Sequence, residues 1–189
     1  MEYSKITTPE ELLQYMDENV VYGVFDFKNN KRCCDVDLGA LTNQIWKLSS
    51  PKQMQQHGTG HCYDQVELER DFFKKQNFAF KTFFIWFNCK RQNAYPTHTY
   101  LVYQDKKTKK WCWFEHADFI NKGIHIFDTL SEAINAQKLA LIRYAKQCRK
   151  SKTDPSKIEV FEYDNVKYGC SFCEFIDHVL RTGKQIEIK

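Results

Sequence analysis

The chain has 189 residues, of which 42% are hydrophobic and 15% aromatic, and its net charge is +4. A chain of this length can bury roughly 70% of the surface that its unfolded form exposes, so general intrinsic disorder is excluded. A nucleic-acid-binding protein usually concentrates its basic residues on one face. A net charge of +4 is too small to indicate that class of protein.

A helix and a short strand are expected near the N-terminus. The segment 8–11, Thr-Pro-Glu-Glu, opens the helix, because threonine can cap it, proline suits its first position and the last glutamate can complete a capping box. We expect this helix to end near Glu18 and a strand to follow over 22–27, with a turn at Asn29-Asn30. Residues 37–61 are expected to mix helical turns and loop.

Strands dominate the middle of the chain. Helices are expected from Cys62 towards Lys75, over 131–146 and over 171–180. Strands are expected over 78–87, 97–103, 111–116, 123–127 and 158–163. Helices before and after a run of strands joined by short loops indicate an α+β fold with an antiparallel sheet. No repeat or Pro/Gly-rich linker divides the chain, so we expect a single domain over residues 1–189.

Cys62 is the best candidate nucleophile among the 8 cysteines. It follows the glycine-rich segment 57–61, His-Gly-Thr-Gly-His, and stands where a helix is expected to begin. Backbone N–H groups are unpaired there and the helix dipole is positive, so a thiolate is favoured. The same N–H groups can hold the oxyanion that forms on an attacked carbonyl.

A base, and an acid to orient it, are expected on the two following strands. The polar stretch 104–110 is typical of a hairpin turn. A turn centred on the Lys106–Lys107 bond would place His98 directly opposite Glu115, with Cβ atoms about 5 Å apart. Glu115 would then hold one imidazole nitrogen and leave the other for Cys62. A slip of one residue would put the two side chains on opposite faces of the sheet.

Three blocks carry a family resemblance: Gly-His-Cys-Tyr-Asp at 60–64, Thr-His-Thr-Tyr-Leu-Val at 97–102 and Lys-Trp-Cys-Trp-Phe-Glu at 110–115. Together they resemble the motif of the transglutaminase-like superfamily of papain-like cysteine enzymes, over residues of about 50–120. The chain departs from the motif in three places. Glu115 replaces the usual aspartate, Thr99-Tyr100 replaces a common Ala-Trp pair, and Tyr63 stands where tryptophan often follows the cysteine.

The resemblance implies a helix that carries the cysteine, packed on an antiparallel sheet that carries the histidine and the acid. It also implies thioester chemistry on a peptide or amide substrate: Cys62 attacks, His98 moves the proton and Glu115 fixes the tautomer. Water or an amine then accepts the acyl group. No cofactor or metal is expected. Gln56 has the spacing of the glutamine that helps to form the oxyanion hole in papain-like enzymes.

Two other functions remain open at this stage. A catalytically inactive binding module would keep the same fold and use its cleft for binding. A zinc-stabilised interaction domain would use Cys170 and Cys173, which have the spacing of one ligand pair, although a structural zinc site needs two such pairs.

The sequence also predicts the cellular compartment of the protein and its partners. The N-terminus carries no apolar segment behind a basic start, and no stretch approaches about 18 apolar residues. We therefore expect a cytoplasmic protein with free thiols and no membrane contact. We further expect a monomer that acts on a peptide or protein substrate.

Overall fold

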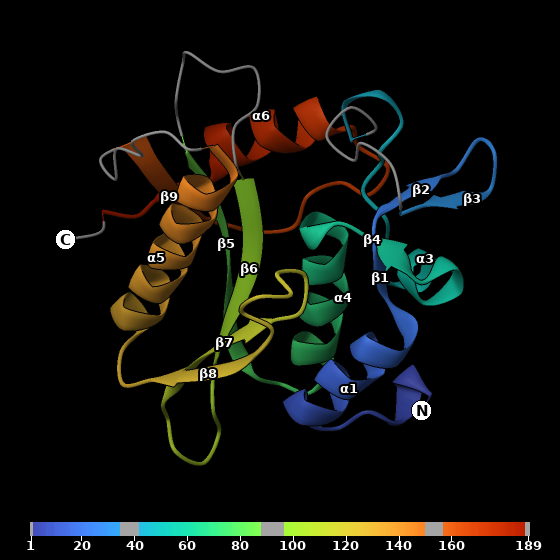
Figure 1. Cartoon of the computed structure of the whole chain (residues 1–189). Coiled ribbons are helices and arrows are strands. Elements are labelled where there is room, and N and C mark those ends of the chain that lie inside the picture. Colours follow the sequence, from blue (N-terminus) through green and yellow to red (C-terminus); the bar gives the residue numbers. More distant parts are fainter. Residues whose placement is uncertain (1, 35–41, 88–96, 150–156, 188–189) are drawn as a thin grey trace.

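The computed structural model describes residues 2–34, 42–87, 97–149 and 157–187. Its centre is a six-stranded antiparallel sheet with the order β10-β9-β5-β6-β7-β8 (Figure 1). The strands are β5 (Ala79–Phe87), β6 (Thr97–Gln104), β7 (Trp111–Glu115), β8 (Gly123–Phe127), β9 (Ile158–Tyr163) and β10 (Lys184–Gln185). Strands β5 to β8 follow one another in the chain, and β9 returns to the free edge of β5.

Helices cover both faces of this sheet, with α4 and α5 on opposite sides in Figure 1. The helices are η1 (Tyr3–Lys5), α1 (Pro9–Asn19), α3 (Pro51–His57), α4 (Cys62–Lys75), α5 (Leu130–Arg149) and α6 (Phe172–Thr182). The α+β class and the antiparallel sheet predicted from the sequence are therefore confirmed. None of the helices in the described residues is long and apolar enough to cross a membrane.

Alternation along the strands divides the core between the two faces. On one face, Leu101 and Phe114 are fully buried with Phe73 of α4. On the other face, Val102 and Trp113 pack in one cluster with α5. Helix α6 joins the α4 side through contacts of its own with β5 and β9. The two helical layers meet different side chains of the same strands, so each strand contributes to both cores.

Local capping explains where α1 begins. The Thr8 hydroxyl accepts a hydrogen bond from the Glu11 backbone N–H (3.2 Å), and Glu11 Oε2 accepts one from the Thr8 N–H (3.1 Å). Pro9 occupies the first helical position. The capping box predicted here is confirmed, and the helix ends at Asn19, one residue beyond the expected end.

The single strand expected over 22–27 is wrong. The chain forms β1 (Val21–Tyr22), which pairs in parallel with β4 (Thr59–Gly60), and β2 (Val24–Asp26), which pairs with β3 (Lys31–Cys33). Gly23 separates them, and a Cβ at Gly23 would lie 2.8 Å from the Cys33 carbonyl oxygen. A backbone approach this close was not visible in the hydrophobic pattern. Its consequence is that β1 lies beside the segment leading into α4.

Candidate functional site

Cys62 is the first residue of α4, and the segment before it is tightly constrained. Gly58 ends α3 in the left-handed conformation (φ 58°), and a Cβ there would lie 2.5 Å from the Asn19 carbonyl oxygen. A Cβ at Gly60 would lie 2.6 Å from the Asp64 Cβ. Both glycines are therefore required by space, and the second also shapes the entry to the helix. The Cys62 residue is only 2% exposed.

Asp64 ties the start of α4 to a neighbouring loop. Its carboxylate accepts hydrogen bonds from the His61 N–H (2.9 Å), the Trp46 Nε1–H (2.8 Å) and the Ser49 N–H (2.7 Å). Asp64 therefore caps the helix from a buried position. Burial raises the pKa of Asp64 to about 6, and the three donors act against that rise.

A second tie runs from Gln65 through the fold. The Gln65 Nε2–H donates to the Gly60 carbonyl (2.9 Å), and its Oε1 accepts from His116 Nδ1 (2.7 Å). His116 Nε2 lies 3.2 Å from Asp17 Oδ1 on α1, which also binds Lys122 (2.6 Å). The backbone before Cys62 is thus held by side chains from α4, α1 and the loop after β7.

His98 and Glu115 form the contact expected of a base and its orienting acid. His98 Nε2 donates to Glu115 Oε2 at 2.8 Å, which leaves Nδ1 for another partner. The predicted register is wrong, however. Leu101 pairs with Phe114 and Gln104 with Trp111, so the turn is centred on the Lys107–Thr108 bond.

The observed pairing differs from the predicted one by two residues, and this difference preserves the contact between His98 and Glu115. A shift of two residues keeps every side chain on its own face, so His98 and Glu115 become diagonal neighbours instead of direct partners. They lie beyond Leu101–Phe114, the last β6–β7 pair, at the end of the sheet. They also belong to the face that α5 covers, whereas α4 packs on the other face. The thiol and the imidazole therefore meet where β6 and β7 are no longer paired.

Glu115 is buried and receives several donors. Besides His98, its carboxylate accepts from the Trp113 Nε1–H (3.1 Å), the Asp118 N–H (2.8 Å) and the Gln137 Nε2–H of α5 (3.5 Å). A carboxylate with 2% exposure needs such donors to offset the loss of its water. The same donors fix the direction in which Glu115 presents its charge to His98.

The electrostatics of the site favour a charged imidazole. Burial opposes the imidazolium, but the negative charge of Glu115 and a hydrogen bond with Cys62 outweigh it, so the pKa of His98 is raised well above its ordinary value. The Cys62 thiol and the His98 ring are therefore close neighbours. Another buried acid of α4, Glu69, lies close to all three groups. Burial and the charge of Glu115 raise the pKa of Glu69 well above its ordinary value.

Gln56 does not lie in this cluster. It belongs to α3, and its side chain is exposed. The spacing that suggested Gln56 ignored Gly58, which turns the chain between α3 and Cys62. The residues that surround Cys62 and that sequence patterns missed are Tyr22, Asp64 as a buried anchor, Gln65 and Glu69. They come together through tertiary contacts, and no local motif points to them.

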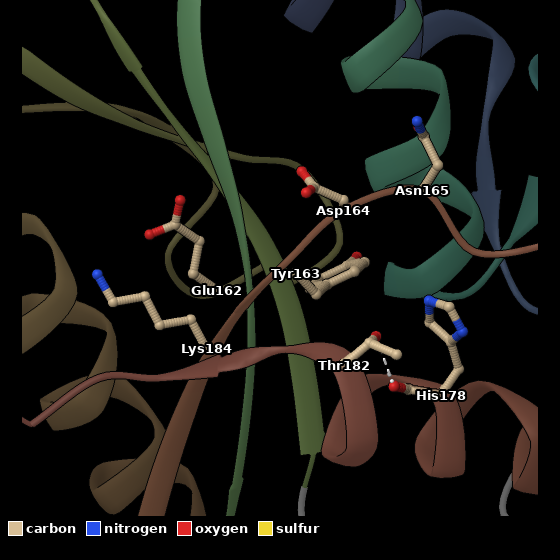
Figure 2. Close-up of a pocket in the computed structure, with 7 residues that line it drawn as sticks. All are labelled: Glu162, Tyr163, Asp164, Asn165, His178, Thr182 and Lys184. Carbon is tan, nitrogen blue, oxygen red and sulfur yellow. Dashed lines mark hydrogen bonds between the residues drawn. The ribbon is translucent and has the colours of Figure 1, made fainter.

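The cysteine pair at 170 and 173 and the hollow described below form no cluster comparable with Cys62, His98 and Glu115. Cys170 is buried and Cys173 is exposed, and in the described ranges no group of three or more His, Cys, Asp or Glu side chains is arranged to hold a metal ion. A hollow of about 350 Å³ lies between β9, α6 and β10, and Cys62, His98 and Glu115 are not among its lining residues (Figure 2). It is lined by Glu162, Tyr163, Asp164, Asn165, His178, Thr182 and Lys184. No family model and no curated protein sequence matches this chain.

Proposed function

We propose that this protein is a cysteine-dependent acyl-transfer enzyme of the transglutaminase-like, papain-like kind. The observation that carries the proposal is the His98–Glu115 hydrogen bond beside the Cys62 thiol. The three residues come from a helix start and two strands, and an orienting acid, a base and a thiol in that order are the parts of an activated nucleophile. The three-block motif around the same residues supports the same family.

The reaction follows from these roles. The Cys62 sulfur attacks the carbonyl carbon of a peptide amide, and the C=O electron pair moves to oxygen. As this tetrahedral species collapses, the C–N bond breaks, and His98 gives its proton to the departing amine. Water or a second amine then attacks the thioester carbonyl, and His98 takes up the proton that this acceptor loses. The C–S bond breaks as the C=O bond re-forms, which releases the acyl product and returns the Cys62 thiolate. Glu115 holds the imidazole orientation in both halves. Each step uses side chains of this chain alone.

The substrate we propose is a peptide or protein amide. A transferase and a hydrolase differ only in the acceptor of the acyl group, so both share the acyl-enzyme on Cys62. The first experiment therefore looks for the shared step and not for either product.

The test is alkylation by iodoacetamide between about pH 5 and 9, measured for each cysteine by peptide mass spectrometry. Cys62 is 2% exposed, so an ordinary thiol at this position would react slowly. A thiolate–imidazolium pair should instead make Cys62 react rapidly at about pH 6, and His98→Ala should abolish that reactivity. Exposed Cys173 provides the internal reference, and His178→Ala, a histidine of α6, is the matched control.

A second readout guards against poor access of the reagent. After incubation with the activated ester p-nitrophenyl acetate, the wild-type protein should carry an acetyl group on Cys62, and His98→Ala should not. A Cys62 that is neither alkylated faster than Cys173 at low pH nor acetylated would contradict the proposal. The fold would then be better explained as a binding module.

A further inference from the structure

Tyr22, outside the Cys-His-Glu cluster, is fixed to the segment that leads into the nucleophile. Its strand, β1, pairs in parallel with β4, and Tyr22 is the register partner of Gly60. The Val21 N–H donates to the Gly58 carbonyl (2.9 Å), and the Gly23 N–H donates to the Gly60 carbonyl (3.3 Å). The backbone of Tyr22 is therefore locked to the chain just before Cys62.

The ring of Tyr22 is oriented by the residue next to the nucleophile. It stacks on the His61 imidazole with a centroid distance of 5.1 Å and an interplanar angle of 10°. His61 Nδ1 lies 3.3 Å from the Thr42 hydroxyl, which holds the imidazole in turn. Tyr22 is nevertheless 43% exposed. A large aromatic ring that is held on one side and open on the other is available to a molecule that approaches Cys62.

The Tyr22 phenol lies within electrostatic reach of Cys62 and Glu115. Desolvation, followed by the negative charge that Cys62 can carry and by Tyr63, raises the pKa of Tyr22 well above its ordinary value. Tyr144 and Glu115 act on it in the same direction. The phenol therefore keeps its proton at every pH at which the enzyme would work. In the described part of the chain, no hydrogen bond occupies this hydroxyl, so it remains a donor for a ligand.

We propose that Tyr22 is a catalytic residue whose hydroxyl donates a hydrogen bond to the oxyanion of the tetrahedral intermediate on Cys62. This inference rests on the proposed function, because it assigns the group that stabilises the charge formed by the Cys62 attack. The Tyr22 proton stays on its oxygen throughout. The hydrogen bond becomes stronger as the carbonyl oxygen gains negative charge, and it becomes weaker again when the C=O bond re-forms.

The N-terminus of α4 provides the complementary donors. Backbone N–H groups in the first turn of a helix have no acceptor within that helix and point outward along its axis. These N–H groups and Tyr22 belong to different elements, α4 and β1. Together they could hold a carbonyl oxygen from two directions. Exposed Gln56 on α3 is thus replaced in this role by Tyr22.

The experiment compares Tyr22→Phe with the wild type in two reactions of Cys62. The first is acetylation by p-nitrophenyl acetate, in which an oxyanion forms on the attacked carbonyl. Removal of one oxyanion donor should slow it by about 10²- to 10³-fold in kcat, with KM changed by only a few-fold. The second is alkylation by iodoacetamide, which displaces iodide at a saturated carbon and forms no oxyanion. Its rate should stay within about two-fold.

Phenylalanine keeps the ring and its stacking on His61, so the variant should retain its fold, which thermal unfolding checks. Tyr168→Phe is the matched control, because Tyr168 is 44% exposed and lies outside the cluster, and it should leave both rates unchanged.

The outcomes separate the two proposals. If Tyr22→Phe acetylates at the wild-type rate while Cys62 is alkylated normally, Tyr22 is not the oxyanion donor and the proposed function stands. If both reactions slow equally, Tyr22 acts on the thiol itself, which also overturns the inference. If wild-type Cys62 is neither acetylated nor unusually reactive, the proposed function fails and the inference fails with it.

Discussion

The length of the Glu115 side chain decides whether it can orient His98. Diagonal neighbours on adjacent strands have Cα atoms about 7–8 Å apart, further than direct partners. The glutamate covers this offset and reaches the His98 ring at 2.8 Å. The aspartate that is usual in the motif would be one methylene shorter. The glutamate that replaces the usual aspartate is therefore consistent with the observed register, because the longer side chain spans the longer diagonal distance.

This explanation predicts that Glu115→Asp and Glu115→Gln have similar effects, one through lost reach and the other through lost charge. The negative charge of Glu115 helps to raise the pKa of His98, so that pKa should fall by about one to three pH units in both variants. NMR titration of the His98 ring measures it. Glu174→Gln is the control and should leave the pKa of His98 unchanged, because Glu174 is an exposed acid of α6 outside the cluster. An aspartate variant with the wild-type titration would show that reach is unimportant.

At the scale of an element, α4 differs from the other capped helices in the burial of its capping acid. Asp64 of α4 and Glu174 of α6 occupy the same position and accept from the same backbone group, the N–H of the residue before the helix. Glu174 is exposed and its other partner is the Ser171 hydroxyl (2.7 Å). Asp64 is 1% exposed and also holds Trp46 and Ser49. The start of α4 therefore anchors a loop as well as a helix.

Replacement of each acid by alanine should separate these roles. Glu174→Ala removes an exposed cap and should lower the free energy of unfolding by about 1 kcal/mol. Asp64→Ala leaves three buried donors without an acceptor. Each costs about 1–3 kcal/mol, so the loss should exceed about 3 kcal/mol. Urea unfolding measures both losses. Where Asp64→Ala does not fold, Asp64→Asn should show an intermediate loss. Equal losses in the two alanine variants would refute the anchoring role.

At the scale of the whole molecule, the parts that could be predicted are those with local causes. The capping box at Thr8 and Glu11 involves neighbours in sequence, and the helix at Cys62 begins within a residue of its expected start. The face shared by His98 and Glu115 follows from strand alternation. The exact register does not, because it depends on a turn in which Lys109 adopts a left-handed conformation (φ 60°) that its residue type does not suggest.

The remaining parts of the candidate site depend on contacts between distant segments. Tyr22 lies beside the segment before Cys62 because Gly23 lets the chain pass close to Cys33 and because β1 pairs with β4. His116 meets Gln65 from a loop that lies 51 positions further along the chain. Neither contact has a periodicity or a motif from which it could be inferred, so a single sequence could name the cluster but not its supporting residues.

Buried histidines should make the stability of the whole protein sensitive to acid. Burial lowers the pKa of His57, His61 and His116 to about 4. In the unfolded chain these residues take up protons below about pH 6.5, whereas in the folded protein they remain neutral until about pH 4. Each one therefore contributes stability above pH 6.5 that is lost as the pH falls towards 4.

His116→Gln isolates one of these contributions, because a glutamine can still donate to Gln65. Between pH 7 and 5 the wild type should lose about 2 kcal/mol more free energy of unfolding than the variant. Asp64, whose pKa of about 6 acts in the opposite direction, is present in both proteins and cancels in the comparison. Urea unfolding at the two pH values provides the measurement. A variant that loses as much as the wild type would mean that His116 already carries a proton in the folded state, shared with Asp17 at 3.2 Å. The tie between α1 and the Cys62 segment would then be an ion pair.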